Sequence, residues 1–360
     1  MKRILTIATL ALFTFHILPT STAQTVVDLY TPGITAEGNF YCLPKTVVRI
    51  AVKIEKTTYT PGEFAPYAER FLRLKDVGME PLNSYRILGL SQTAMGVSDS
   101  EKIYAIRFNP KSAAVNVAKA EDGVLLAINA EPRYQSQPST FVPAPKPVAV
   151  NPRQFLNEEI LVAGSTAKMA QLTAQEIYDI RSSRSELIKG QADYMPKDGE
   201  QMKVMLSQLD QQDKALTSMF AGTTECDTVE QVFVIVPDKE QKRQVLFRFS
   251  KRFGLVDADD VCGEPYSFSV FNLTQLPPVN EKEAKKKKKA AGGLYYNVAG
   301  KMLLTIYKGN DVVSEEEFPA GQFGYVEVLS PDLFNKHYGT RLWLNPITGG
   351  IDKLEAEQSK

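Results

Sequence analysis

The chain contains one run of five consecutive lysines: Lys285, Lys286, Lys287, Lys288 and Lys289. Clustered lysines are attracted to anionic glycans and lipid head groups, at about 1 kcal/mol for each lysine near a negative surface. The six lysines and two glutamates of residues 281–289 together carry a net charge of +4. Because the run lies between two strand-like segments, we favour a flexible, solvated loop, and contact with an anionic surface is the alternative.

Histidines and clustered carboxylates are the next candidates for chemistry. Of the two histidines, His16 lies in the N-terminal leader, so a Ser-His-Asp triad would require His337, which we interpret as a loop residue. Asp257, Asp259 and Asp260 have a spacing that suits calcium, but the segment lacks the glycine and distal glutamate of an EF-hand, which favours a solvated turn. The sequence therefore predicts no catalytic, cofactor-binding or metal-binding residue, and no cofactor.

Three cysteines are present: Cys42, Cys226 and Cys262. An oxidising compartment would allow one disulfide, and three pairings are open. Cys226 and Cys262 flank two strand-like runs, so we favour a disulfide between them and expect Cys42 to be a small buried side chain.

Residues 1–23 have the composition of a secretory signal peptide. Two basic residues precede an apolar stretch from Ile4 to Leu18, and small side chains lead up to a predicted cleavage site after Ala23. An uncleaved membrane anchor is the alternative, but 15 mostly apolar residues are few for a helix that needs roughly 20 to span a bilayer. No later stretch is long and apolar enough to span. We therefore expect an exported protein, either periplasmic or at the outer surface.

The overall composition excludes a global attraction to nucleic acid. The 360 residues include 42 basic and 42 acidic side chains, and 43% of the residues are hydrophobic, which is ordinary for a globular protein of several domains. The segment AGSTAK at residues 163–168 lacks the second glycine and the preceding strand of a phosphate-binding loop. We expect no nucleic-acid partner.

The N-terminal half predicts a strand-rich domain at residues 24–130. In residues 46–59 apolar side chains alternate with polar ones, which predicts a half-buried strand, and residues 63–74 predict a short amphipathic helix that packs on the same sheet. Residues 131–152 contain six prolines, so we expect an extended linker that acts as a spacer; a peptide motif for an aromatic groove is the alternative.

The C-terminal half predicts helices followed by strands. Residues 153–222 contain two apolar stripes at helical spacing, separated by a polar loop, which predict an antiparallel helical hairpin. Residues 223–354 contain seven short strand-like runs, which predict an antiparallel, immunoglobulin-like β-sandwich with a lysine-rich loop at residues 281–293. The predicted fold class is therefore α+β with several domains.

Three stretches of the chain resemble a family of secreted proteins of Bacteroides-type bacteria that is catalogued as a domain of unknown function. They are LPKTVVRIAVKIEKTTYTPGEFAPYAERFL, EIYDIRSSRSELIKGQADYMPKDGEQMKVMLSQLDQQDKALTSMFAGTT, and GLYYNVAGKMLLTIYKG with FPAGQFGYVEVLS. The resemblance implies a Gram-negative cell envelope. The family has no assigned activity and no established catalytic residues, so the resemblance assigns no role to any residue of this chain. Residues 227–229 also resemble the O-glycosylation acceptor pattern of such bacteria, which makes Thr228 a candidate site.

These observations lead to two hypotheses of function. The first is a non-enzymatic exported envelope protein that binds or scaffolds an unidentified envelope protein or glycan. The alternative is a glycan hydrolase that uses a pair of carboxylates far apart in the sequence, which the sequence does not identify.

Overall fold

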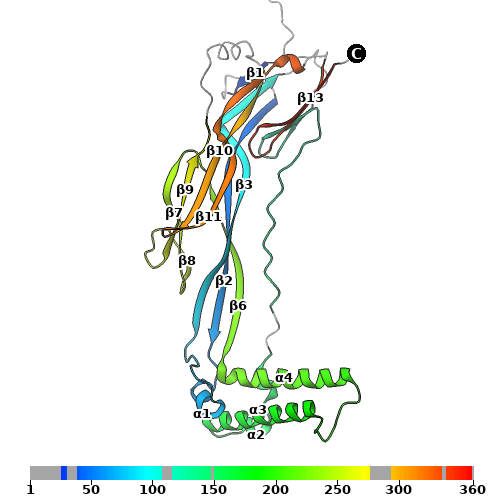
Figure 1. Cartoon of the computed structure of the whole chain (residues 1–360), viewed down its shortest axis with the longest axis vertical. Coiled ribbons are helices and arrows are strands. Elements are labelled where there is room, and N and C mark those ends of the chain that lie inside the picture. Colours follow the sequence, from blue (N-terminus) through cyan, green and yellow to red (C-terminus); the bar gives the residue numbers. More distant parts are fainter. Residues whose placement is uncertain are drawn as a thin grey trace, which may run out of the picture.

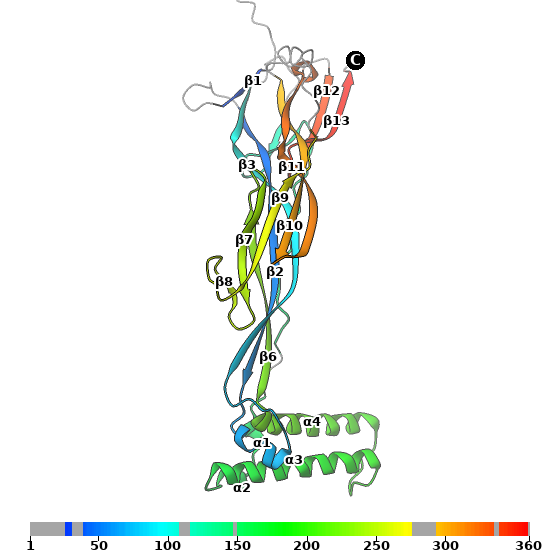
Figure 2. The same cartoon turned by 60° about the vertical axis from the view of Figure 1, so that its left-hand side comes forward.

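The structure, a computed structural model, describes residues 26–30, 39–107, 116–146, 150–275, 293–334 and 338–358. The molecule is elongated (Figures 1 and 2): three β-sheets lie at one end, a group of helices lies at the other, and strands β2, β3 and β6 connect them. We call the three sheets the body. The neck is the polar part of the connecting strands, residues 55–60, 82–86 and 223–228. The head is residues 61–81 and 152–222.

Sheet A contains the connecting strands. Its order is β1-β3-β2-β6, with all neighbours antiparallel, and its strands are β1 Val26–Leu29, β2 Asn39–Thr60, β3 Leu82–Arg107 and β6 Thr223–Ile235. Strands β2 and β3 are unusually long, at 22 and 26 residues, whereas strands in globular proteins usually have about three to ten. These two strands extend beyond the body as the neck.

Sheets C and B complete the body. Sheet C has the order β11-β10-β9-β7-β8, with β7 Gln241–Ser250, β8 Gly254–Val256, β9 Glu264–Asn272, β10 Leu294–Lys308 and β11 Asp311–Leu329. Sheet B has the order β13-β12-β5-β4, with β4 Val117–Lys119, β5 Leu125–Ile128, β12 Tyr338–Leu344 and β13 Ile351–Gln358. A short 3-10 helix, Pro331–Phe334, precedes β12.

The alternation predicted for residues 46–59 is confirmed in β2. Val48, Ile50, Val52 and Ile54 are all buried and point at sheet C, where the core also contains Phe247, Tyr266, Phe268, Val270, Met302, Leu304 and Ile306. Burying such side chains contributes about 1.5–3 kcal/mol each. Sheets A and C are therefore held together face to face by one apolar core.

A second core joins all three sheets at the end of the body far from the head. It includes Tyr41, Leu43 and Tyr104 of sheet A, Leu125, Ile128, Leu342 and Leu344 of sheet B, and Leu294 of sheet C. The rings of Tyr104 and Tyr295 stack with their centroids 4.5 Å apart. The three sheets therefore form one packed unit.

The head contains the two long helices that the sequence predicts. They are α3 Thr166–Lys189 and α4 Gly199–Ala221, and three short helical segments pack beside them: Ala65–Tyr67 with α1 Ala68–Leu72, Pro152–Phe155, and α2 Glu158–Leu161. Ser165 and Asp198 cap the N-termini of α3 and α4, and Gly190 and Gly222 end these helices with positive φ angles.

Two expectations about packing differ from the structure. The helix predicted at residues 63–74 packs on α3 and α4 rather than on the sheet of β2, because Phe64 and Leu72 fill the apolar core of the head. Strands from the stretches 24–130 and 223–354 share sheets, since β6 pairs with β2 and β12 pairs with β5. Local patterns identified the strands, but pairing between distant strands depends on packing. The immunoglobulin-like type of sandwich stays a prediction.

The proline-rich segment runs along the molecule from sheet B to the head (Figure 1). Residues 131–146 contain no helix or strand, as the prolines predict. The segment is fixed near its start by Gln135, whose side chain bonds both the N–H and the C=O of Gly96. Lower down, Lys146 forms an ion pair of 2.5 Å with Asp227 of β6.

Candidate functional site

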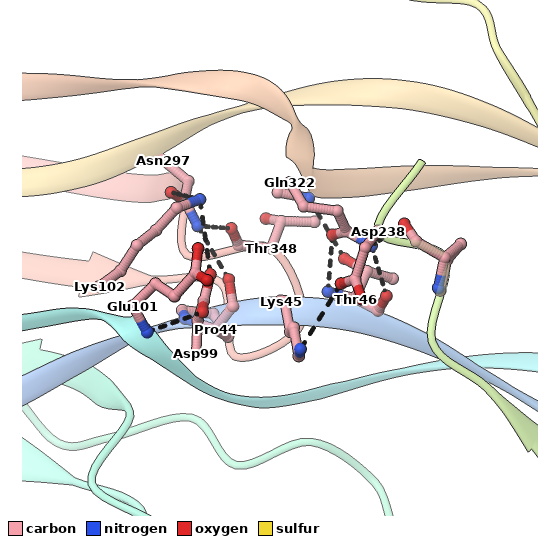
Figure 3. A network of polar contacts seen from close by, with 12 residues as sticks. Pro44, Lys45, Thr46, Asp99, Glu101, Lys102, Asp238, Asn297, Gln322 and Thr348 are labelled. Carbon is pink, nitrogen blue, oxygen red and sulfur yellow. Dashed lines mark hydrogen bonds and ion pairs between the residues drawn. The ribbon is translucent and has the colours of Figure 1, made fainter. Parts of the chain in front are cut away.

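Two regions are candidates for function: a buried polar cluster in the body and an apolar groove on the head. The polar cluster lies where β2, β10, β11 and the turn between β12 and β13 meet (Figure 3). Asn297 and Thr46 are fully buried there. Buried polar groups of this kind are either structural clasps or parts of a site, and their hydrogen bonds distinguish the two.

The side chains of the polar cluster form hydrogen bonds with backbone groups. Asn297 Nδ2 donates to the carbonyl oxygens of Pro44 and Thr348, at 2.9 and 2.8 Å. Gln322 Nε2 donates to Thr46 O at 2.7 Å, and Gln322 Oε1 accepts the Thr46 N–H at 2.9 Å. These bonds satisfy backbone groups that would otherwise be buried without partners, which costs about 1–3 kcal/mol each. The cluster is thus a clasp between sheets.

The residues of this clasp can approach one another because residue 321 is a glycine. A Cβ atom built on Gly321 would lie 2.6 Å from Thr348 O and 2.8 Å from Asn297 Nδ2, and real Cβ atoms almost never come so close. No room is left for a ligand between these groups. The cluster fixes the positions of the sheets and is not a binding pocket.

The groove on the head is open and mainly apolar. It lies between the loop-proximal halves of α3 and α4, has a volume of about 460 Å³, and is lined by Leu187, Tyr194, Val204, Met205 and Leu209 together with a few polar side chains. Volumes of about 300–1,000 Å³ are usual for ligand pockets. Met and Tyr side chains are enriched in protein-binding surfaces, because Met adapts its shape and Tyr combines an apolar ring with a polar tip.

The groove exists because the core of the head fills only half of the hairpin. The buried residues of α4 are Ala215, Leu216, Met219 and Phe220, all in its C-terminal third, where the short helices cover it. The other halves of α3 and α4 project sideways from the neck (Figure 1). Ile188, predicted to belong to the apolar stripe, is 62% exposed there.

Two ion pairs hold the projecting part of the hairpin together. Arg181 contacts Asp213 at 3.0 Å, and Arg184 contacts Asp210 at 2.8 Å, each joining α3 to α4. Exposed pairs of this kind contribute only about 0–1 kcal/mol each, but they fix how the two helices face each other. The arrangement therefore presents a preformed apolar groove at the end of the molecule.

The predicted site residues are spread over the molecule. Cys226 lies in the neck, where its Sγ is 3.8 Å from Thr57 Oγ1, and Cys262 lies in the turn before β9; both are exposed free thiols rather than the predicted pair. Cys42 is half-buried in β2, and burial raises the pKa of its thiol. Thr228 lies in β6 opposite Glu55, and its glycosylation stays a prediction.

The remaining candidates form no site in the described part of the chain. Asp257 and Asp260 belong to the turn between β8 and β9, where Asp260 Oδ1 accepts the Cys262 N–H and this bond lowers the pKa of the Asp260 carboxyl. No group of three or more His, Cys, Asp or Glu side chains that would hold a metal occurs among the described residues. Residues 1–23, the run Lys285 to Lys289 and His337 lie outside the described residues.

Sequence reasoning missed the groove. Met205 and Leu209 belong to the second apolar stripe of residues 153–222, whose helical spacing predicts burial, yet both are only partly buried. The signal that would have revealed the groove is the absence of a third apolar segment long enough to cover the whole hairpin.

No helix in the described residues has the length and apolar character to cross a bilayer.

Comparison with family models gives one match, described as a domain of unknown function (DUF4831), over residues 37–352. This range covers the neck, the head and most of the body. Comparisons with curated proteins and with solved structures give no match.

Proposed function

We propose that this chain, which belongs to the DUF4831 family, is a non-enzymatic exported cell-envelope protein that binds a partner with its head and holds that partner away from its body. The observation that supports this most directly is the neck. Three strands leave the body, and beyond Tyr85, which packs on the core between sheets A and C, they reach the head without a second sheet against them (Figure 2). Such a shape separates a binding surface from the rest of the molecule.

The neck is built to stay extended in water. Its β2 part reads EKTTYT, and none of residues 55–60, 82–86 and 223–228 is buried. Threonine and tyrosine favour strands because of their side-chain shape, so they keep the ribbon formed without an apolar core. Thr58 Oγ1 donates to Asn83 Oδ1 at 3.1 Å, and Arg86 pairs with Glu55 at 2.8 Å, so cross-strand polar contacts take the place of a core.

The head is attached firmly to the neck. Tyr59, at the end of β2, donates its hydroxyl to Gly78 O at 2.9 Å and to Ala221 O at 3.1 Å. The Phe64 N–H donates to Met219 O at 2.7 Å. The groove of the head therefore has a fixed orientation relative to the neck, which a scaffold requires.

The compartment is part of the proposal. The leader at residues 1–23 and the family resemblance support export to the envelope of a Gram-negative cell, with cleavage after Ala23. Cell fractionation tests this: we expect the mature chain in the periplasm or at the outer surface. Full-length chain in the cytosol would contradict it.

The alternative, a glycan hydrolase, requires a carboxylic acid whose pKa is raised so that it donates a proton at neutral pH. The described carboxyl groups with a shifted pKa are Asp260 and Glu355, and hydrogen bonds lower the pKa in both cases. Incubation of the mature protein with glycans and peptidoglycan separates the hypotheses. We expect no product from any of them, and release of product would overturn the non-enzymatic proposal.

The role of the groove is tested by substitution. Val204 is 61% exposed and lines the groove, so Val204→Asp should leave the fold intact but place a charge among the apolar side chains that meet the partner. We expect retention on immobilised envelope extract to fall at least about tenfold. The neighbouring Lys203 does not line this groove, and Lys203→Asp is the control that should retain binding. Equal retention of both variants would exclude the groove as the binding surface.

A further inference from the structure

In the described part of the chain the body and the head are joined by two connections. One is the neck. The other is the proline-rich segment, residues 131–152, which we call the strap, and Figure 1 shows its described part running from sheet B toward the head. The sequence predicts that these residues act as a spacer, but the neck already sets the distance between body and head. A second connection therefore has a different mechanical effect, which depends on its length and its anchors.

The strap is fixed to the body at its upper end. Gln135 Oε1 accepts the Gly96 N–H at 2.9 Å, and Gln135 Nε2 donates to Gly96 O at 3.2 Å. The indole N–H of Trp343 donates to Glu131 O at 3.1 Å. Strands β3 and β12, which belong to different sheets, therefore both hold the start of the strap.

The strap is fixed to the head at its lower end. Arg153 Nη2 donates to both carboxylate oxygens of Glu63, at 3.0 and 2.9 Å. Leu156, directly after the 3-10 helix Pro152–Phe155, is buried in the apolar core of the head. The exposed ion pair contributes only about 0–1 kcal/mol, whereas burial of a leucine contributes about 1.5–3 kcal/mol. The apolar core is therefore the main lower anchor.

Strand β2 measures the distance between two contacts of the strap. Gly96, which holds Gln135, pairs with Thr46 of β2. Asp227, which forms the ion pair with the strap lower down, pairs with Lys56 of β2. The ten residues along the strand from Thr46 to Lys56 span about 33 Å, at roughly 3.3 Å for each residue.

The strap has no slack over the same distance. Gln135 and Lys146, its residues at these two contacts, are eleven residues apart. Eleven residues span about 34 Å in the polyproline II conformation, which rises about 3.1 Å for each residue. Fully extended, they would reach only about 36–40 Å. This part of the strap can therefore lengthen by only about 2–6 Å.

Proline keeps the strap from becoming shorter. Six of the 22 residues of the strap are prolines. Proline is excluded from the interior of a helix, and it restricts the residue before it to extended conformations. Contraction to a helix, with about 1.5 Å for each residue, is therefore blocked. Residues 131–146 contain neither helix nor strand.

The strap also keeps step with β2 along the neck. Lys146 and Arg153 are seven residues apart, and so are their counterparts Lys56 and Glu63. Seven residues reach at most about 25 Å. The covalent chain therefore limits how far the head can move from the body on the side of the strap.

We propose that the strap is a brace that keeps the head in one direction relative to the body. The neck has no apolar core of its own, and segments with few buried apolar contacts move easily. When a ribbon bends beside a parallel chain that is fixed at both ends, that chain must become longer or shorter. The strap resists both changes. This inference goes beyond the proposed binding role, because it concerns the shape of the chain with or without a partner.

The brace is tested by pulsed electron paramagnetic resonance of the mature chain, which measures the distribution of distances between two spin labels. One label is attached at Val312→Cys in the body and the other at Val162→Cys in the head, where the native side chains are 57% and 73% exposed. In every sample Cys42, Cys226 and Cys262 are replaced by serine. We expect one narrow distribution of distances.

A longer strap should release the head. Insertion of Gly-Ser-Gly-Ser between Val142 and Pro143 keeps every anchor residue and adds about 11 Å of flexible chain. We expect the distribution to widen at least about twofold, because the head can then bend in both directions. The matched control inserts the same four residues between Asp193 and Tyr194, in the loop between α3 and α4, and should leave the width unchanged.

The stiffness of the strap is tested without a change in its length. Pro143→Gly combined with Pro145→Gly removes two fixed φ angles and should widen the distribution less than the insertion does. Val142→Ala, at a side chain that is 80% exposed, is the control and should not widen it. Circular dichroism verifies that each variant is folded.

Two outcomes would overturn the brace: an insertion variant whose distribution is as narrow as that of the parent chain, or a parent distribution that is already as wide as that of the insertion variant. An unchanged width in the double glycine variant would overturn the role of the prolines.

Discussion

The body and the neck share the same strands, but different forces hold them. Along β2, every other residue from Val48 to Ile54 is buried against sheet C, whereas no residue from Glu55 to Thr60 is buried. The change occurs where the sequence passes from RIAVKI to EKTTYT. A strand therefore continues beyond its core when β-favouring polar residues and cross-strand contacts replace apolar packing.

The largest effect should come from removing apolar volume in the body. Ile50 is fully buried in the core between sheets A and C, so Ile50→Ala should lower the free energy of unfolding by about 2–5 kcal/mol. Thr58→Ala, on the same strand but in the neck, removes one cross-strand hydrogen bond and a β-favouring side chain, and it should lower this free energy by at most about 1 kcal/mol. Urea unfolding followed by fluorescence of Trp343, the single tryptophan, measures both. Similar decreases in the free energy of unfolding for Ile50→Ala and Thr58→Ala would contradict the difference between body and neck.

A smaller but still clear effect should come from the clasp. Gly321→Ala should destabilise the body by about 1–3 kcal/mol, because the new methyl group would collide with Thr348 O and displace Asn297. Gly89 lies in β3, and a Cβ atom there would meet nothing within 4 Å. Gly89→Ala is the control and should be neutral or slightly stabilising. Thermal unfolding measures both variants, and equal unfolding temperatures for Gly321→Ala and Gly89→Ala would show that the clasp is not tightly packed.

The smallest effect concerns pH. Burial first, and then the nearby Glu327 carboxylate, raises the pKa of Tyr296 to about 12. The unfolded chain ionises this tyrosine near its ordinary pKa of about 10, so the stabilisation is complete below about pH 10 and is lost as the pH rises toward about 12. Tyr296→Phe should therefore reduce the loss of stability between about pH 9 and about pH 11.

The measurement is the urea midpoint of wild type and Tyr296→Phe at both pH values. Tyr59→Phe in the neck serves as a comparison, because it removes a tyrosine hydroxyl that bonds Gly78 and Ala221 without a carboxylate partner in those bonds. If wild type and Tyr296→Phe lose the same stability between the two pH values, the ionisation of Tyr296 does not contribute to that loss.

The candidate groove was only half predictable. The periodicity of residues 153–222 identified both helices, α3 and α4. Periodicity states which face of a helix is apolar, but not what covers that face. Met205 and Ile188 carry the same signal as Leu216, and only the limited reach of the short helices leaves them partly or fully exposed.

The sequence by itself determined the elements: the strands with their buried sides, the two long helices, and a proline-rich segment that forms neither. These are local properties, because backbone preferences and side-chain periodicity act within a few residues. Only the tertiary structure decided that strands from the two ends of the chain share sheets, that Asn297 clasps Pro44 to Thr348, and that β6 lies at an edge of sheet A. Those features depend on contacts between residues far apart in the chain, whose free energy no local pattern contains.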